Sequence, residues 1–173
     1  MIENMTDESI YEVYRRAVGH FPSGSIFVEV GCYYGKSVIF LAEEINRVGK
    51  NIKVFAVDTF DYKEGVKEKV DIYPDFLNNI TEYLNIIVPF KVPSILAGHK
   101  FGWEADFVFI DANHEFESVL MDILIWKRVV KRGGWIGGHD YNDDGVRRAV
   151  NTVFRLLERD VEVIKTDSWL VKL

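Results

Sequence analysis

The sequence is poor in cysteine, and it holds no long uncharged apolar run. Cys32 is the only cysteine among 173 residues, so no internal disulfide can form, and a reducing compartment is expected. No segment approaches the ~20 consecutive uncharged residues that span a bilayer. The acidic start, residues 1–8, lacks the basic and then apolar order of a signal peptide. We therefore expect a cytoplasmic protein without a membrane partner.

Positive charge is also scarce. The chain carries 21 lysines and arginines against 27 acidic residues, a net charge of −6. Because contacts to phosphates supply most of the affinity for nucleic acids, this balance predicts no nucleic-acid partner. The basic residues are scattered apart from three pairs on predicted helices, where solvation of a surface explains them: Lys127-Arg128, Lys131-Arg132 and Arg147-Arg148.

Strand-like and helix-like segments alternate along the chain, which predicts an α/β fold. The length fits a single domain of residues 1–173, with a first helix within residues 1–22 capped by Thr6 or Asp7. Strands are expected at 25–30, 51–57, 92–97, 106–110, 135–138, 161–165 and 169–172. Further helices are expected at 35–48, 75–88, 118–131 and 145–157.

The connections between these segments predict a Rossmann-like, doubly wound and mostly parallel sheet of seven strands. Helical crossovers join parallel strands, whereas the short turn between the last two strands requires them to pair antiparallel. One strand near the C-terminus is therefore reversed. Residues 59–74 are charged and aperiodic, the longest expected loop, and this loop is a candidate lid.

A glycine turn follows the first strand. The strand ends with Glu29, the chain turns through Gly31 and Gly35, and a helix begins near Ser37. Such a turn points backbone N–H groups into a crevice at the carboxyl edge of the sheet. The spacing is one residue short of a Walker A loop. A dinucleotide fingerprint needs glycine where Tyr33 stands, and the anionic Glu29 would repel a pyrophosphate. The remaining pattern, E-x-G-x-x-x-G, suits a cofactor with a cationic end, which predicts S-adenosylmethionine.

Acidic residues stand at the ends of other predicted strands. Asp58, Asp111 and the pair His139-Asp140 follow strands whose carboxyl ends meet at one edge of the sheet. A single aspartate at such a place is often only the cap of the next helix. The whole set favours a ligand site, and Asp58 can accept hydrogen bonds from ribose hydroxyls.

Four stretches of the chain resemble the class I S-adenosylmethionine-dependent methyltransferases, over residues 25–173. They are V-E-V-G-C-Y-Y-G-K-S, V-F-A-V-D, F-V-F-I-D-A-N-H and G-G-W-I-G-G-H-D-Y. The resemblance is closest to small-molecule O-methyltransferases of the catechol type and of the bacterial sugar and macrolide type. It implies methyl transfer to a hydroxyl of a small-molecule or sugar-like acceptor. It also implies that Gly31, Tyr33 and Ser37 hold the methionine end, Asp58 the ribose, and Asp111 the amino group or a metal, while Glu29 and Gly35 complete the cofactor turn.

The resemblance raises the question of a divalent metal at Asp111, His139 and Asp140. His139 stands where the metal-dependent relatives carry an aspartate. Mg²⁺ prefers oxygen ligands, whereas an imidazole shifts the preference toward Mn²⁺, Fe²⁺ or Zn²⁺. His139 is therefore a ligand of a softer metal, a base at a site without metal, or a support for the glycine-rich turn.

Two other histidines are candidates for the site. His114 stands three residues after Asp111, where the catechol-type enzymes carry a lysine base. With an ordinary pKa of ~6.5 it can accept a hydroxyl proton at neutral pH, although it could instead cap the following helix or pack against it. His99 follows the weak strand expected at 92–97, at a position that faces the adenine in relatives.

Two rival functions remain beside methyl transfer. The same fold can cleave or otherwise use S-adenosylmethionine, and it can serve as a non-catalytic cofactor-binding partner subunit. The chain carries little beyond the core fold. The acceptor pocket must therefore come from the first helix, the 59–74 loop and the loop at Tyr141, to which a homo-oligomeric partner could add.

Overall fold

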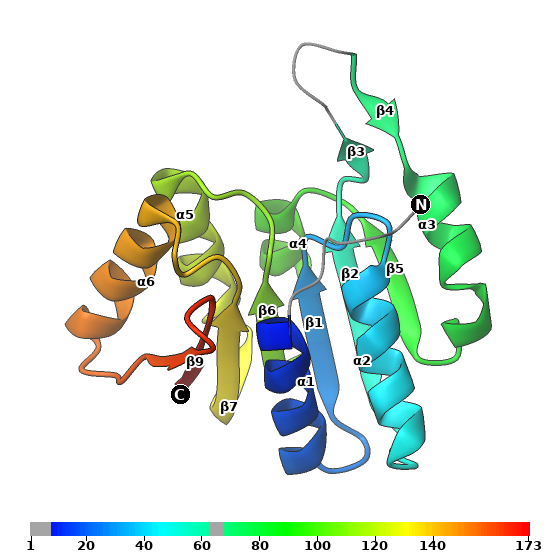
Figure 1. Cartoon of the computed structure of the whole chain (residues 1–173), viewed down its shortest axis with the longest axis horizontal. Coiled ribbons are helices and arrows are strands. Elements are labelled where there is room, and N and C mark those ends of the chain that lie inside the picture. The colour runs from blue at the N-terminus through cyan, green and yellow to red at the C-terminus, as the bar shows by residue number, and fades with distance from the viewer. Residues whose placement is uncertain (1–7, 63–67) are drawn as a thin grey trace.

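A seven-stranded sheet organises the chain, which the structure, a computed structural model, describes over residues 8–62 and 68–173. The strand order is β5-β2-β1-β6-β7-β9-β8 (Figure 1). The strands are β1 (Ile26–Val30), β2 (Lys53–Asp58), β5 (Ile87–Lys91), β6 (Ala105–Ile110), β7 (Val130–Gly138), β8 (Glu162–Ile164) and β9 (Ser168–Lys172). β9 pairs antiparallel with both β7 and β8, and the other pairs are parallel. The predicted fold class, with its one reversed strand, is confirmed.

Helices cover both faces of the sheet (Figure 1). They are α1 (Glu8–His20), α2 (Lys36–Arg47), α3 (Tyr73–Asn79), α4 (Ser94–Lys100), α5 (Phe116–Trp126) and α6 (Asp144–Leu156). Successive strand residues point to opposite faces, so Phe107 and Phe109 pack under α1 and α2, whereas Val108 and Ile110 pack under α5 and α6. The middle of β6 is thus apolar on both sides. None of the helices in the described part of the chain is long and apolar enough to cross a membrane.

The segment between β2 and β6 corrects two predictions. The helix expected at 75–88 ends early, because α3 and the short 3₁₀ helix Thr81–Tyr83 give way to β5. The strand expected at 92–97 is instead the helix α4, which Pro93 precedes as its N-cap residue. β5 lies at the edge of the sheet, where Pro89 is tolerated because the missing N–H costs no ladder hydrogen bond in the interior.

The candidate lid, residues 59–74, is not a plain loop. It contains a hairpin of two short antiparallel strands, β3 (Asp61–Tyr62) and β4 (Val70–Asp71), and α3 begins at Tyr73. The hairpin stands above the carboxyl ends of the parallel strands (Figure 1). Residues 63–67 lie outside the described residues, as do the expected caps Thr6 and Asp7.

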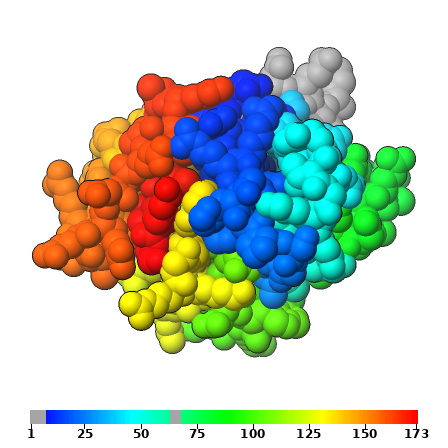
Figure 2. Space-filling model, turned by 90° about the horizontal axis from the view of Figure 1, so that it is seen from below, coloured from blue at the N-terminus to red at the C-terminus, as the bar shows by residue number. Residues whose placement is uncertain are grey.

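The C-terminal strands are tied to the N-terminal helix. Seen from below, α1 lies between α2 and the C-terminal segment (Figure 2). The hydroxyl groups of Ser9 on α1 and Ser168 on β9 share a buried hydrogen bond of 2.8 Å. Because β9 runs against the parallel strands, its beginning, not its end, lies at their carboxyl edge. The turn before β9 is thereby brought to the crevice.

Candidate functional site

The glycine turn after β1 is pressed against the end of β6. Gly31 has a φ of +86°, and a Cβ built on it would lie 2.0 Å from the carbonyl oxygen of Asp111. Only glycine fits both the conformation and the contact. Gly35, with a φ of +89°, directs the chain into α2. Two neighbouring strand ends therefore meet without a side chain between them.

Asp58 at the end of β2 closes the turn from the other side. Its Oδ2 accepts hydrogen bonds from the amides of Cys32, at 2.7 Å, and Tyr33, at 3.0 Å. Its Oδ1 accepts one from the amide of Phe60, at 2.8 Å. These bonds hold Tyr33 in a left-handed conformation, with a φ of 49°, that non-glycine residues rarely adopt. Asp58 thus fixes the shape of the turn.

A pocket of about 540 Å³ opens between the ends of β1, β2 and β6. Its volume is in the range of small-molecule and cofactor sites, ~300–1,000 Å³. The pocket brings together the predicted residues Gly31, Tyr33, Asp58 and Asp111, and Tyr62 of the hairpin also lines it. The rings of Tyr33 and Tyr62 meet edge to face with centroids 4.8 Å apart, so the hairpin contacts the glycine turn directly.

Glu29 and Ser37 support the turn from within the core and do not line the pocket, and their contact with a cofactor stays a prediction. Glu29 has no exposed surface, and its carboxylate accepts a hydrogen bond from the Ser37 hydroxyl. Burial raises the pKa of Glu29 to about 8, although hydrogen bonds from Ser37 and Tyr14 oppose the rise. Tyr14 of α1 is buried. Its place beside Glu29 could not be predicted from the sequence, in which Tyr14 is one more residue on the apolar face of a helix.

The structure brings Asp111, His139 and Asp140 together beside this pocket. One ligand atom from each lies within 4.8 Å of the others. The His139 Nδ1 atom is 3.2 Å from Oδ2 of Asp140 and 3.7 Å from Oδ1 of Asp111. Asp140 has a φ of 56°, which turns its side chain back toward its neighbour's ring. The cluster offers two carboxylates and one imidazole nitrogen to a cation.

His114 joins the cluster through Asp140. Its Nε2 atom is 2.8 Å from Oδ2 of Asp140, and its side chain is half exposed. A histidine held by a carboxylate and open to solvent can exchange protons with a ligand in the crevice. Its alternative role as a helix cap is not observed, because Glu115 is the N-cap residue of α5 and makes no side-chain cap bond.

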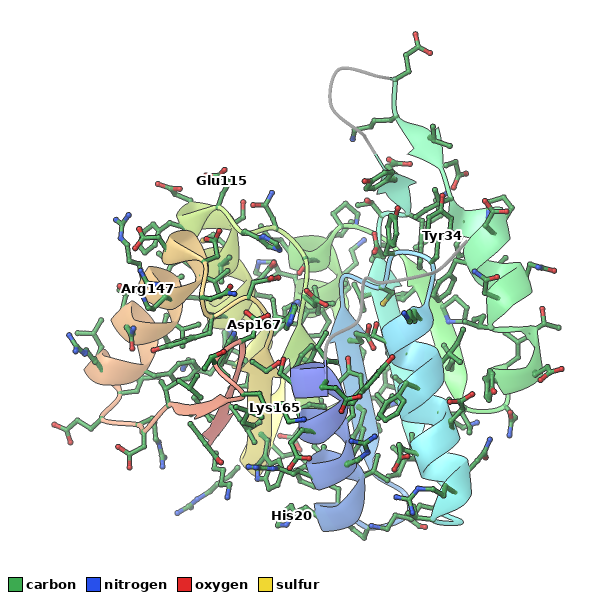
Figure 3. All side chains as sticks on the ribbon, in the orientation of Figure 1. His20, Tyr34, Glu115, Arg147, Lys165 and Asp167 are labelled. Carbon is green, nitrogen blue, oxygen red and sulfur yellow. The ribbon has the colours of Figure 1, made fainter. Side chains whose placement is uncertain are left out.

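Asp167, in the turn between β8 and β9, completes the cluster and was not predicted. Its Oδ2 atom is 3.0 Å from Nε2 of His139. Figure 3 labels Asp167 near the upper end of β7 and His20 at the opposite end of the molecule. Burial lowers the pKa of His139, but hydrogen bonds to Asp111 and Asp140 outweigh it and raise this pKa to about 10. Without a cation, an imidazolium at residue 139 neutralises part of the acidic cluster.

His99 does not lie at a strand end, which corrects its predicted position. It is in the last turn of α4, beside Phe101 and Trp103 in the segment that leads into β6. α4 starts at the crevice and runs toward the beginning of β6, so His99 lies at the amino edge of the sheet. His99 does not line the crevice pocket.

Comparisons with known proteins agree with this architecture. A family model described as a methyltransferase domain matches residues 28–141. The O-methyltransferase NovP has a similar structure, with a TM-score of 0.75 at 13% identity, covering 95% of this chain and 79% of NovP. SMU.1697c from Streptococcus mutans, assigned as a methyltransferase and solved with S-adenosylhomocysteine, gives a TM-score of 0.71 at 14% identity, covering 97% of this chain and 99% of that one.

An RNA-modifying enzyme shares the fold as well. An rRNA methylase from Streptococcus thermophilus gives a TM-score of 0.66 at 16% identity, covering 97% of this chain and 96% of its own. No curated protein sequence matches this chain. The family match spans most of the chain and includes all three strand ends that form the pocket. The chain therefore belongs to the methyltransferase-domain family, and its fold is that of the class I S-adenosylmethionine-dependent methyltransferases.

Proposed function

We propose that this protein transfers the methyl group of S-adenosylmethionine to a hydroxyl oxygen of a small acceptor, and that residues 1–173 act as one domain. One observation carries the proposal: the pocket between the glycine turn and Asp58 opens beside the cluster of Asp111, His139 and Asp140. Cofactor binding and proton transfer are thus arranged side by side. In such an enzyme, positioning and exclusion of water supply most of the acceleration.

The residues of the pocket fit this cofactor. Gly31 lines the pocket with backbone alone, and Asp58 and Asp111 line the same space. These carboxylates suit the ribose hydroxyls and the cationic amino and sulfonium groups of S-adenosylmethionine. We assign the ribose to Asp58, and we assign Asp111 to the amino group or to a metal. Tyr33 then flanks the methionine end.

The cluster also fits a divalent cation. Asp111, His139 and Asp140 supply two oxygens and one nitrogen, a mixed set that suits Mn²⁺, Fe²⁺ or Zn²⁺ better than Mg²⁺. These three residues would hold the ion. When bound, such an ion lowers the pKa of an acceptor hydroxyl and orients its oxygen.

A side chain of the protein accepts the proton that the acceptor hydroxyl loses. As the acceptor oxygen bonds to the methyl carbon, the carbon–sulfur bond breaks and the neutral S-adenosylhomocysteine leaves. The hydroxyl proton must go to a base, and His114 is placed for this role, since it is half exposed and held 2.8 Å from Asp140. Asp140 stabilises the imidazolium that forms.

A small acceptor agrees with the charge of the molecule. The net charge of −6 and the acidic crevice repel a phosphate backbone, so the similarity to rRNA methylases does not extend, in our proposal, to the substrate. The hairpin residue Tyr62 and the turn residue Tyr33 offer aromatic surface at the mouth of the pocket. A second copy of the chain could complete the acceptor site.

The proposal is tested by following S-adenosylmethionine with labelled methyl in the presence of Mn²⁺. Catechols, hydroxylated sugars, amines and a short RNA serve as separate acceptors, and products are identified by mass spectrometry. We expect S-adenosylhomocysteine together with an O-methylated catechol or sugar. Methylated RNA alone would overturn the acceptor class. Fragments such as methylthioadenosine would indicate cleavage of the cofactor, and bound but unreacted cofactor would indicate a non-catalytic subunit.

A further inference from the structure

Asp167 stands apart from the other acidic residues of the site, because it does not follow a parallel strand. It lies in the turn that connects β8 to β9, and its side chain is largely buried. The family match ends at residue 141, so Asp167 lies outside the matched segment. Its carboxylate nevertheless reaches His139, with 3.0 Å between Oδ2 and Nε2.

The backbone holds this turn firmly against the His139 segment. Gly138 pairs with Trp169 across β7 and β9, and the amide of Tyr141 donates a hydrogen bond of 2.7 Å to the carbonyl oxygen of Asp167. Lys165 and Thr166 take positive φ values of 48° and 69°, which fold the turn tightly. The Ser9–Ser168 hydrogen bond anchors the next residue to α1. The carboxylate is therefore presented by a rigid frame.

The contact with Asp167 bears on which nitrogen of the His139 ring keeps its proton. A carboxylate only accepts hydrogen bonds, so without a cation both ring nitrogens of His139, each beside a carboxylate, carry a proton. Nδ1 faces Asp140 at 3.2 Å and Asp111 at 3.7 Å, so a cation bound between these two carboxylates would take the place of the Nδ1 proton, whereas Asp167 would keep the proton on Nε2. A carboxylate behind a histidine in this way fixes both the orientation of the ring and the nitrogen that is free to bind a metal.

We propose that Asp167 is a positioning residue that holds the Nε2–H of His139 and so presents Nδ1 to the cation-binding gap between Asp111 and Asp140. This inference rests on the cation site of the proposed function and names the residue that makes His139 a competent ligand. Nδ1, not Nε2, is the ligand atom. The reversed strand β9 acquires a role in the site, because only a strand of that direction brings its preceding turn to the crevice.

The first test is the Mn²⁺ affinity of the purified full chain, measured by calorimetry. Asp167→Ala is expected to weaken binding by about 10- to 100-fold, the effect typical of losing a carboxylate behind a metal-bound histidine. Asp167→Asn keeps an acceptor oxygen and should retain an intermediate affinity. Asp160→Asn, an exposed aspartate just before β8, serves as the matched control and should bind as the wild type does. Unchanged affinity in Asp167→Ala would overturn the proposal.

A double-mutant cycle separates positioning from general damage. In a His139→Ala background, Asp167→Ala should have no further effect on Mn²⁺ affinity, because the residue acts only through the ring. An equal loss in both backgrounds would contradict the proposal. Binding of S-adenosylhomocysteine by Asp167→Ala should stay within about twofold of wild type, which shows that the variant is folded and separates this proposal from the proposed cofactor site.

A spectroscopic measurement decides the question even for protein that binds no Mn²⁺. Proton NMR of the wild type should show a downfield Nε2–H resonance of His139, assigned by its absence in His139→Ala. The resonance should shift upfield or vanish in Asp167→Ala and persist in Asp160→Asn. Its absence from the wild type, or its survival in Asp167→Ala, would overturn the role of Asp167. Lack of Mn²⁺ binding alone would remove only the metal from the proposed function.

Discussion

At the scale of single residues, Asp58 performs two tasks with one carboxylate. It holds the amides of Cys32, Tyr33 and Phe60, and in our proposal it also accepts the ribose hydroxyls. Removing the whole side chain would abolish both interactions at once, so its effect on cofactor affinity could not be assigned to either. We therefore predict the effect of Asp58→Asn, which keeps one acceptor oxygen for the amides of Cys32 and Tyr33 but loses the charge and the acceptor for the amide of Phe60. Hydrogen bonds to a charged group contribute ~1.5–3 kcal/mol, so affinity for S-adenosylhomocysteine should fall about 10- to 100-fold.

Calorimetry checks this prediction directly. Asp75→Asn, an exposed aspartate on α3 that does not line the pocket, is the matched control and should leave the affinity unchanged. If Asp58→Asn binds S-adenosylhomocysteine as tightly as the control, the ribose is held elsewhere.

Glu29 makes the stability of the protein depend on pH. Burial raises its pKa to about 8 in the folded chain, from an ordinary value of 4.5, so between these values the folded state holds a proton that the unfolded state releases. The free energy of unfolding must therefore decrease as pH rises from about 5 to 8, by at most about 1.4 kcal/mol per pH unit from this group. Glu29→Gln, which stays neutral, should flatten this slope.

Urea unfolding at pH 5, 6.5 and 8 measures the slope. The difference between wild type and Glu29→Gln isolates the contribution of Glu29, and the exposed Glu104→Gln provides the control. Parallel pH profiles for wild type and Glu29→Gln would mean that Glu29 is ionised in the fold.

At the scale of elements, the contact between the glycine turn and the end of β6 determines whether the pocket forms. A Cβ at Gly31 would lie 2.0 Å from a backbone oxygen that cannot move aside. We predict that Gly31→Ala unfolds at least ~2 kcal/mol more easily than wild type and loses binding of S-adenosylhomocysteine. Gly24→Ala is a closely matched control, because Gly24 has a φ of +92° and no atom within 4 Å of its built Cβ.

Chemical denaturation of both variants separates the backbone strain of a positive φ from the steric clash with β6. Gly24→Ala reports the cost of the positive φ alone, and the additional loss in Gly31→Ala reports the collision with β6. Equal destabilisation of the two variants would show that the turn and β6 are not in close contact.

The hairpin of β3 and β4 stays a candidate lid. Tyr62 connects it to Tyr33 on the glycine turn, so a ligand beneath both rings should couple the two elements. We predict that S-adenosylhomocysteine slows amide hydrogen exchange in residues 59–74, and that Tyr62→Ala removes much of this protection. Exchange that is the same with and without ligand would end the idea of a lid.

The sequence predicted those elements and residues whose placement follows from local pattern. Asp58, Asp111, His139 and Asp140 could be assigned to one crevice, because the carboxyl ends of parallel strands meet at one edge. The segment 86–100 could not be assigned correctly. Ile86, Ile87 and Val88 continue the apolar stripe of the preceding helix, although Ile87 and Val88 belong to the strand β5. α4 is too short, at seven residues, to show a helical period.

Two features of the site depend on contacts between distant segments and so were invisible in the sequence. The burial of Glu29 follows from the packing of Tyr14 on α1 over β1. The approach of Asp167 to His139 follows from the register of β9 on β7, which no local pattern specifies.

At the scale of the whole molecule, both ends of the described chain converge on the site. α1 covers the buried Glu29 from one side of the sheet, and the reversed strand β9 carries Asp167 to the crevice edge. The Ser9–Ser168 hydrogen bond joins these two elements. The pocket between β1, β2 and β6 and the cluster beside it are therefore supported by elements from both ends of the described chain and not by the glycine turn alone.

The measurement that tests this account most directly is calorimetric titration of the wild-type chain with S-adenosylhomocysteine, with S-adenosylmethionine and, for comparison, with NAD. We expect both sulfur compounds to bind with one site per chain and to compete with each other, and we expect no heat from NAD, whose pyrophosphate would meet Asp58 and Asp111. Binding of NAD, or the absence of binding by both S-adenosyl compounds, would contradict the account.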